Sequence, residues 1–165
     1  MEWRQESKRS IRNELFVVAA ATVAQVALTS FGFLYVASAF AAAVTLFPVC
    51  AVVYVGIQHG ELTVDHTNPS DFCRSTRVFR RFTIVGWVAA ALLHAAALHF
   101  VTAGLCAVCT AYIFRLEGYR WNIEYDETEV LKSISTDRKH IIIQAMLSTL
   151  SFFSAVISVL SSLSL

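Results

Sequence analysis

The sequence predicts an all-α integral membrane protein with five membrane-spanning helices. All thirteen Lys and Arg residues and all twelve Asp and Glu residues fall within three polar islands, residues 1–14, 58–81 and 115–140. The rest of the chain carries no charged residue, over the runs 15–57, 82–114 and 141–165. With 165 residues, 56% of them hydrophobic, the chain makes one membrane domain and has no room for a separate soluble one.

The lengths of the uncharged runs predict the number of spans, because a helix needs about 20 apolar residues to cross a bilayer. The first run has 43 residues and is therefore two spans, and the last has 25 residues and is one. The middle run has 33 residues, and a single helix of that length would reach about 50 Å, so two shorter helices fit better. We expect helices at residues 14–32, 34–57, 82–98, 101–116 and 140–164.

Loop charge supports this count, because Lys and Arg are retained on the cytosolic side of a membrane. Two middle spans place all three islands in the cytosol, whereas one span would separate five cations from the other eight. The carboxyl terminus is then lumenal or extracellular, and the amino terminus is cytosolic if the first helix is retained. The alternative is a cleaved signal sequence. Ala27 and Thr29 would suit a cleavage site but Leu28 and Ser30 would not, so we expect retention.

The second island predicts a helix that begins at Asn68. Asn68 is a good N-cap, Pro69 suits the first helical position, and Asp71 places a carboxylate beside the first-turn amides. In the segment that follows, one face carries apolar residues and threonines and another carries arginines: Phe72, Thr76, Phe79 and Thr83 against Arg74, Arg77 and Arg81. This pattern predicts a helix in the headgroup layer that faces anionic lipid, or simply a lipid-anchored connector.

The third island predicts a short helix from Glu127 to about Ser135. Asp126 as N-cap and Glu129 three positions later approximate a capping box. The helix would set Val130, Leu131 and Ile134 on one side. An aliphatic triplet on a polar cytosolic loop is a candidate docking patch, and contact with the membrane or a neighbouring loop is the alternative.

These two islands carry a resemblance to the cornichon family of endoplasmic-reticulum export receptors. Members have an acidic-Leu-x-x-Asp-Tyr-x-Asn-Pro-x-x-x-Cys stretch, with His66 here in place of Tyr, and later an Asp-x-Thr-x-hydrophobic stretch followed by a basic cluster. The matching residues are Glu61, Leu62, Asp65, Asn68, Pro69 and Cys73, then Asp126, Thr128 and Val130, then Arg138 and Lys139. Further matches are Ala111, Tyr112, Phe152 and Phe153, so the resemblance covers residues 33–165.

The resemblance implies a cornichon-like four-helix transmembrane domain at residues 33–165. Residues 1–32 would be an additional N-terminal extension with a basic segment and an extra hydrophobic helix. The yeast member binds the cargo-selecting subunit of the COPII coat through a segment that falls on Val130, Leu131, Lys132, Ser133 and Ile134. The prolines that members carry in their second and third helices are missing here. Pro48 is extra, frees the carbonyl of Val44 and should bend its helix.

Polar and small residues within the spans are candidates for helix contacts. Ser151, Ser154, Ser158 and Ser161 recur every three or four residues, and similar seams are Ala20, Ala24 and Ala27, then Ala37 and Ala41. His94, His99, Cys106 and Cys109 suggest metal or redox chemistry. However, positions 94 and 99 differ by about 140° around a helix and should not converge, so we expect buried packing, no metal and no cofactor.

The first functional hypothesis is a non-enzymatic cargo receptor for vesicle-mediated transport from the endoplasmic reticulum to the Golgi. Its partners would be transmembrane client proteins, the COPII coat and membrane lipids. The second hypothesis is an auxiliary subunit that modulates the trafficking or gating of a membrane receptor or channel. The third is a small membrane enzyme or metal carrier that uses the two histidines and two cysteines. The basic residues are split among loops and matched by nearby acids, which argues against nucleic acid.

The predicted topology can be tested with glycosylation tags or accessibility probes inserted near Arg77 and near Lys132. Both sites should report the cytosolic compartment, because moving the cations of either island across the hydrocarbon is unfavourable. Opposite compartments for the two sites would contradict both the two-span middle run and the cytosolic patch.

Overall fold

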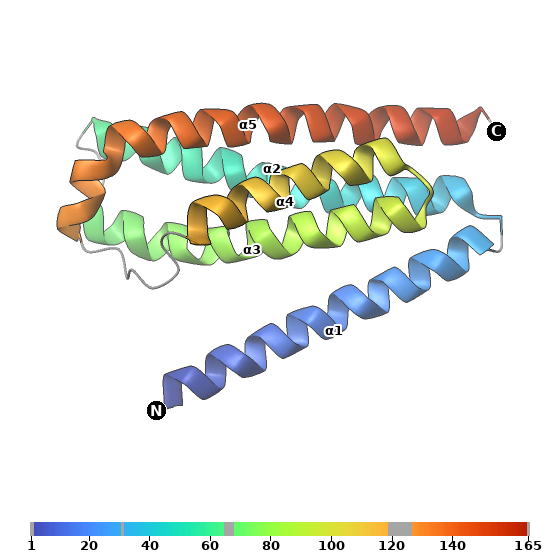
Figure 1. Ribbon diagram of the computed structural model, residues 1–165, viewed down its shortest axis with the longest axis horizontal. Coiled ribbons are helices and arrows are strands. Elements are labelled where there is room, and N and C mark those ends of the chain that lie inside the picture. Colours follow the sequence, from blue (N-terminus) through green and yellow to red (C-terminus); the bar gives the residue numbers. More distant parts are fainter. Residues whose placement is uncertain (1, 31, 65–67, 119–126, 165) are drawn as a thin grey trace.

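The computed structural model describes residues 2–30, 32–64, 68–118 and 127–164, which form five α-helices (Figure 1). Their bounds are α1 Glu2–Ser30, α2 Leu34–Thr63, α3 Pro69–Ala96, α4 Phe100–Gly118 and α5 Glu127–Leu163. The number of helices agrees with the expectation from the sequence, and all five run roughly lengthwise through the molecule.

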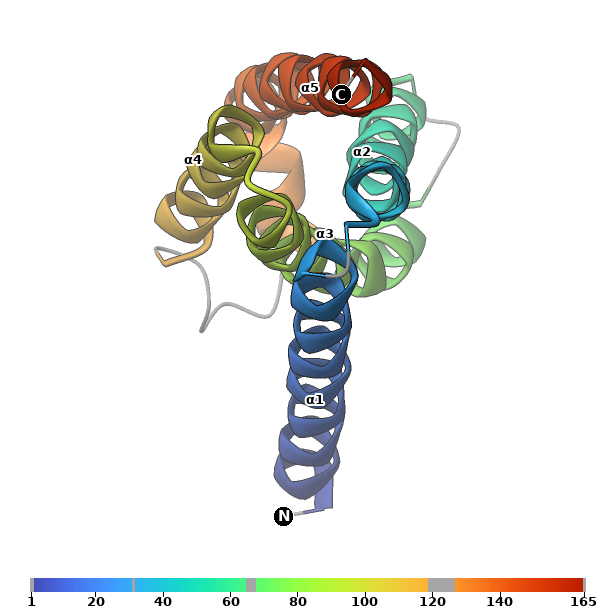
Figure 2. The ribbon, with the colours of Figure 1, turned by 90° about the vertical axis from the view of Figure 1, so that its right-hand side faces the viewer.

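Four of the helices form a closed bundle, and α1 stands apart from it. Figure 2 shows α2, α3, α4 and α5 in a ring, with α2 and α4 each beside both α3 and α5. Of the described helices, α1 contacts α2 and α3, and it diverges from the bundle toward its amino terminus (Figure 1). We call the end of the bundle that carries the α3–α4 turn the turn end, and the opposite end the basic end.

The helices extend well beyond the expected apolar spans. α2 continues to Thr63, α3 already begins at Pro69, and α5 begins at Glu127. Charged side chains must leave the hydrocarbon, but Arg, Lys and Glu are good helix formers, so a helix can continue through them. The separate short helix expected at residues 127–135 is therefore wrong, because that segment is the first part of α5.

The start of α3 agrees with the sequence. Asn68 is the N-cap, its side chain accepts a hydrogen bond from the amide of Ser70, and Pro69 occupies the first turn with Asp71. The face that we expected in the headgroup layer is instead packed against α2. Phe72, Thr76 and Thr83 are buried, and Phe79 stacks on Tyr54 of α2 with ring centroids 4.1 Å apart.

Among the residues that the structure describes, three helices are long and apolar enough to cross a membrane, over Asn13–Ser30, Leu34–Thr63 and Arg138–Leu163. α3 and α4 contribute the shorter apolar segments Phe82–Ala96 and Phe100–Arg115. Three of the five expected spans are thus supported by length and composition. These three helices indicate a membrane protein. The crossing of the membrane by α3 and α4 stays a prediction.

Pro48 lies inside α2 and is fully buried where α2 meets α3. A Cβ atom added to Gly86 of α3 would lie 3.1 Å from the ring carbons of Pro48. The proline ring is rigid, and Gly86 lets the α3 backbone approach it closely. This pair explains a proline at a place where the sequence suggested only a bend.

The turn between α3 and α4 is unusually tight for a segment without glycine. Leu98 has φ of 63°, in the left-handed region that non-glycine residues seldom adopt. The amide of His99 donates to the carbonyl of His94 at 2.9 Å, and that of Leu98 to Ala95 at 3.1 Å. This is a Schellman-type helix end with leucine at the usual glycine position. The chain reverses its direction here, and His99 lies beside the last turn of α3.

Replacing Gly86 by Val should destabilise the bundle by about 2 kcal/mol, because overpacking against the Pro48 ring forces α2 and α3 apart. The measurement is unfolding of the purified protein in detergent, by heat or by a denaturing detergent. Gly104→Ala is the control, since nothing lies within 4 Å of a Cβ added there. Equal stability of the Gly86 variant and the control would contradict the close contact.

Candidate functional site

The residues that resemble the first cornichon motif build the corner between α2 and α3. Leu62 and Phe72 are buried against each other, and Cys73 packs against them. Asn68 caps α3, and the side-chain amide of Gln58 donates to Glu61 at 2.9 Å. Asp65 lies outside the described residues, as does Asp126 of the second motif. The described part of the first motif therefore has a structural role at the basic end.

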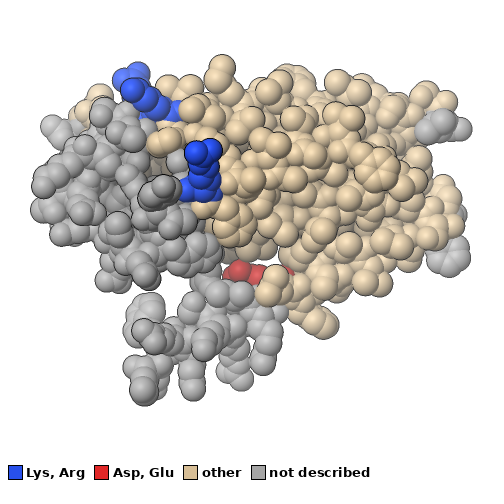
Figure 3. Space-filling view, in the orientation of Figure 1, with Lys and Arg blue, Asp and Glu red and all other residues tan. Residues whose placement is uncertain are grey.

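The expected coat-binding segment, residues 130–134, lies in the amino-terminal part of α5 together with Thr128, and the structure describes only its backbone. One turn later, Arg138 and Lys139 are exposed. Arg74 and Arg115 are exposed as well. Figure 3 shows the described Lys and Arg of one face gathered toward one end of the molecule, whereas the described surface toward the opposite end shows no Lys or Arg. This charge asymmetry is the feature on which the predicted topology depends.

Hydroxyl groups on α5 face the other helices of the bundle. Ser151, Ser158 and Ser162 are buried, and Ser154 is half-buried. Thr102 of α4 lies 2.7 Å from the hydroxyl of Ser154 and 2.9 Å from that of Ser158. The serine stripe expected from the sequence is thus an internal seam, as Ala37 and Ala41 also are. Ser161, which we included in the stripe, is exposed and donates only to its own helix, and Ser162 faces the bundle in its place.

His94 and His99 come together at the turn end, with ring centroids 6.2 Å apart. The expectation that they would not converge is wrong, because it assumed one continuous helix, whereas α3 ends at Ala96 and the chain turns at Leu98. His94 is completely buried and His99 half-buried. The Nε2 atom of His94 lies 3.0 Å from the hydroxyl of Thr45, and that of His99 lies 2.6 Å from Ser38.

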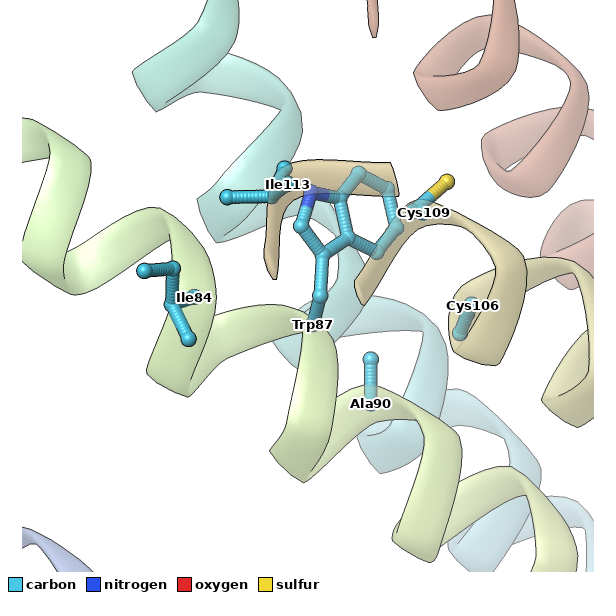
Figure 4. Close-up of a cluster of buried hydrophobic side chains, with 6 residues drawn as sticks. All are labelled: Ile84, Trp87, Ala90, Cys106, Cys109 and Ile113. Atoms are coloured by element: carbon cyan, nitrogen blue, oxygen red, sulfur yellow. The ribbon is translucent and has the colours of Figure 1, made fainter. Parts of the chain in front are cut away.

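The cysteines belong to a different part of the bundle. Cys106 and Cys109 pack with Trp87 and Ile113 in an apolar cluster between α3 and α4 (Figure 4). Cys109 also contacts the hydroxyl of Ser151 at 3.4 Å. Within the described part of the chain, no group of three or more His, Cys, Asp or Glu residues is arranged to hold a metal ion. The four-residue metal or redox centre of the third hypothesis is therefore not assembled in these helices.

α1 is attached to the bundle by two polar side chains that the sequence analysis missed. Gln25 is completely buried and donates to the carbonyl of Ala37 at 2.6 Å. The hydroxyl of Thr29 donates to the carbonyl of Gln25 in its own helix at 2.9 Å and also lies 3.2 Å from the carbonyl of Ala96. A glutamine within an apolar run was the available signal, because a polar amide in hydrocarbon needs a partner. Ala20, Ala24 and Ala27, where we expected a seam, are exposed on the surface of α1.

The contact between Thr45 and His94 can be tested by Thr45→Val, which keeps the shape of the side chain and removes the oxygen. The variant should lose about 1 kcal/mol of stability in detergent, because the buried imidazole is left without its partner. Thr149→Val is the matched control, since Thr149 is exposed and donates only to its own helix, at Ala145. Equal unfolding midpoints for the two variants would refute the contribution of this interhelical hydrogen bond.

The comparisons with known proteins agree with the architecture. No curated protein and no solved structure matches the chain significantly. The model of the cornichon protein family matches residues 32–156, which leaves out all of α1. That match spans most of the chain and includes the α2–α3 corner, the histidine pair and the first part of the hydroxyl seam, Ser151 and Ser154. The chain therefore belongs to the cornichon family.

Proposed function

We propose that this protein is a cargo receptor that binds transmembrane client proteins in the endoplasmic reticulum and links them to the COPII coat for transport to the Golgi. The single observation that carries the proposal is the cornichon family match over residues 32–156. Members of the family are trafficking proteins of the secretory pathway, and an all-helical membrane bundle is consistent with that role.

The continuity of α5 supports the coat-binding part of the proposal. Residues 130–134 lie in the same helix as the membrane span Arg138–Leu163, so a coat subunit bound there would be joined rigidly to the bundle. The expected patch of Val130, Leu131 and Ile134 lies about one to two turns before Arg138, the first exposed cation of that span. A docking site at this height would stand just outside the cytosolic leaflet.

The exposed apolar surface of the helices supports client binding. Only 6% of the apolar window of α1 is buried, compared with 39% for α2 and 22% for α5. Helix recognition within lipid depends on close packing at small residues, and Ala20, Ala24 and Ala27 offer such a face on α1. Two modest interfaces on one bundle raise the effective concentration of client at the coat, so neither has to be strong alone.

The test is replacement of Val130, Leu131 and Ile134 by Ala in the full-length protein. Association with the cargo-selecting coat subunit should fall at least tenfold, because the aliphatic contact is lost. Client association should stay unchanged. A matched control is Glu129→Ala combined with Thr136→Ala, since these positions lie on the opposite side of the helix and should leave coat binding intact.

Unchanged coat binding by the triple variant would contradict the proposed patch. Proximity labelling in cells distinguishes the auxiliary-subunit alternative. Labelling of coat subunits and newly made membrane proteins supports the cargo receptor. Persistent labelling of one surface channel or receptor, without coat subunits, would instead favour an auxiliary subunit.

A further inference from the structure

The hydrogen bonds that His94 and His99 make to hydroxyl groups indicate which nitrogen of each ring carries the hydrogen and which carries a lone pair. The hydroxyl of Thr45 donates its hydrogen to the carbonyl of Ala41 at 2.9 Å, so toward His94 its oxygen can only accept. The Nε2 atom of His94 therefore carries the hydrogen, and its Nδ1 atom is an acceptor. That Nδ1 atom is buried and has no hydrogen-bond partner.

The same reasoning applies to His99. The hydroxyls of Ser38 and Ser162 donate to the carbonyls of Leu34 and Ser158, each at 2.8 Å, and they also contact each other at 2.8 Å. Two hydrogens serve these three contacts, and when each hydrogen lies on the carbonyl of its own helix, the Nε2 atom of His99 is the donor to Ser38 at 2.6 Å. His99 is then also a neutral imidazole whose Nδ1 carries a lone pair.

Two neutral imidazoles, each anchored through Nε2–H, are the usual state of histidines that bind a metal through the other nitrogen. The distance between the rings can be compared with the distance expected for two imidazoles on one ion. With metal–nitrogen bonds of about 2 Å and a ring centre about 1.1 Å beyond each nitrogen, two opposed imidazoles on one ion place their centroids about 6 Å apart. A tetrahedral ion would bring them to about 5 Å. The observed separation is 6.2 Å.

The surroundings favour an ion of low charge and low coordination number. No third His, Cys, Asp or Glu of the described chain joins the pair, so zinc would lack the three or four ligands that it requires. Neither a carboxylate nor a thiolate of that part of the chain offsets the charge of a divalent ion, which is costly to bury. Monovalent copper is satisfied by two nitrogen ligands in a nearly linear arrangement. His99 is half-buried in the turn, so the pair lies next to the exposed Leu98 at the turn end.

We propose that His94 and His99 form a two-imidazole site for one Cu(I) ion at the turn end of the bundle. The site uses residues of α3 and of the α3–α4 turn, and it does not depend on the proposed trafficking function. It differs from the four-residue centre considered from the sequence, because Cys106 and Cys109 have no part in it.

The test is anaerobic titration of the purified full-length protein in lipid nanodiscs with Cu(I), in competition with a chromogenic chelator. One ion should bind per chain, and X-ray absorption should report two nitrogen ligands. His94→Gln and His99→Gln should each weaken binding at least tenfold. His140→Gln is the control, because His140 lies toward the other end of the bundle, where its Nδ1 is hydrogen-bonded to the hydroxyl of Tyr112, and this variant should bind as the unmodified protein does.

A second control separates the histidines from the thiols, which are strong ligands for the same ion. Cys50→Ser and Cys73→Ser combined with Cys106→Ala and Cys109→Ala should keep the binding. Circular dichroism and unfolding measurements identify any variant that does not fold. If His94→Gln does not fold, the test rests on His99→Gln, which changes a half-buried position. Binding that disappears with the cysteines, survives His99→Gln, or is absent from the unmodified protein overturns the proposal.

Discussion

The exclusion of charge from hydrocarbon is the constraint on which this structure depends. It confines every Lys, Arg, Asp and Glu to three islands and leaves the intervening helices to satisfy their polar groups among themselves. The hydroxyls of the spans follow this rule in two ways. Most donate to a carbonyl one turn earlier in their own helix, and several of their oxygens then accept a bond from a neighbouring helix, as Thr45 does from His94. Polar contact between helices is therefore concentrated where hydroxyls and imidazoles meet at the turn end.

The two ends of the bundle have different chemistry as a result. At the basic end, the described part of the cornichon motif forms a corner in which Leu62 and Phe72 are buried and Asn68 starts a helix. At the turn end, Ser38 of α2 contacts both His99 and Ser162 of α5. Thr102 of α4 contacts Ser158 of α5, and His94 of α3 contacts Thr45 of α2. α5 runs from one end to the other as a single helix, Glu127–Leu163. A partner bound at its amino-terminal part would thus be mechanically connected to the hydroxyl seam.

α1 is the element that sets this chain apart from the family match, which begins at residue 32. It is held at its carboxyl-terminal end by Gln25 and Thr29, and farther from that end it diverges from the bundle (Figure 1). Two hydrogen bonds in lipid contribute about 1 kcal/mol each or less. Only 6% of the apolar window of α1 is buried, so packing adds little to its attachment. A helix attached in this way can keep its remaining surface for lipid or for another transmembrane segment.

The sequence by itself determined the class of protein, the number of helices and the cap at Asn68, because charge placement and local capping act over a few residues. It also identified the family, through residues now seen to build the α2–α3 corner. Only the tertiary structure decided which polar residues meet. Gln25, Ser162 and the pairing of His94 with His99 were missed or misjudged, since they depend on helix rotation and on a left-handed Leu98 that no local preference predicts. The same holds for Pro48 and Gly86, whose contact exists because two helices pass close together in space.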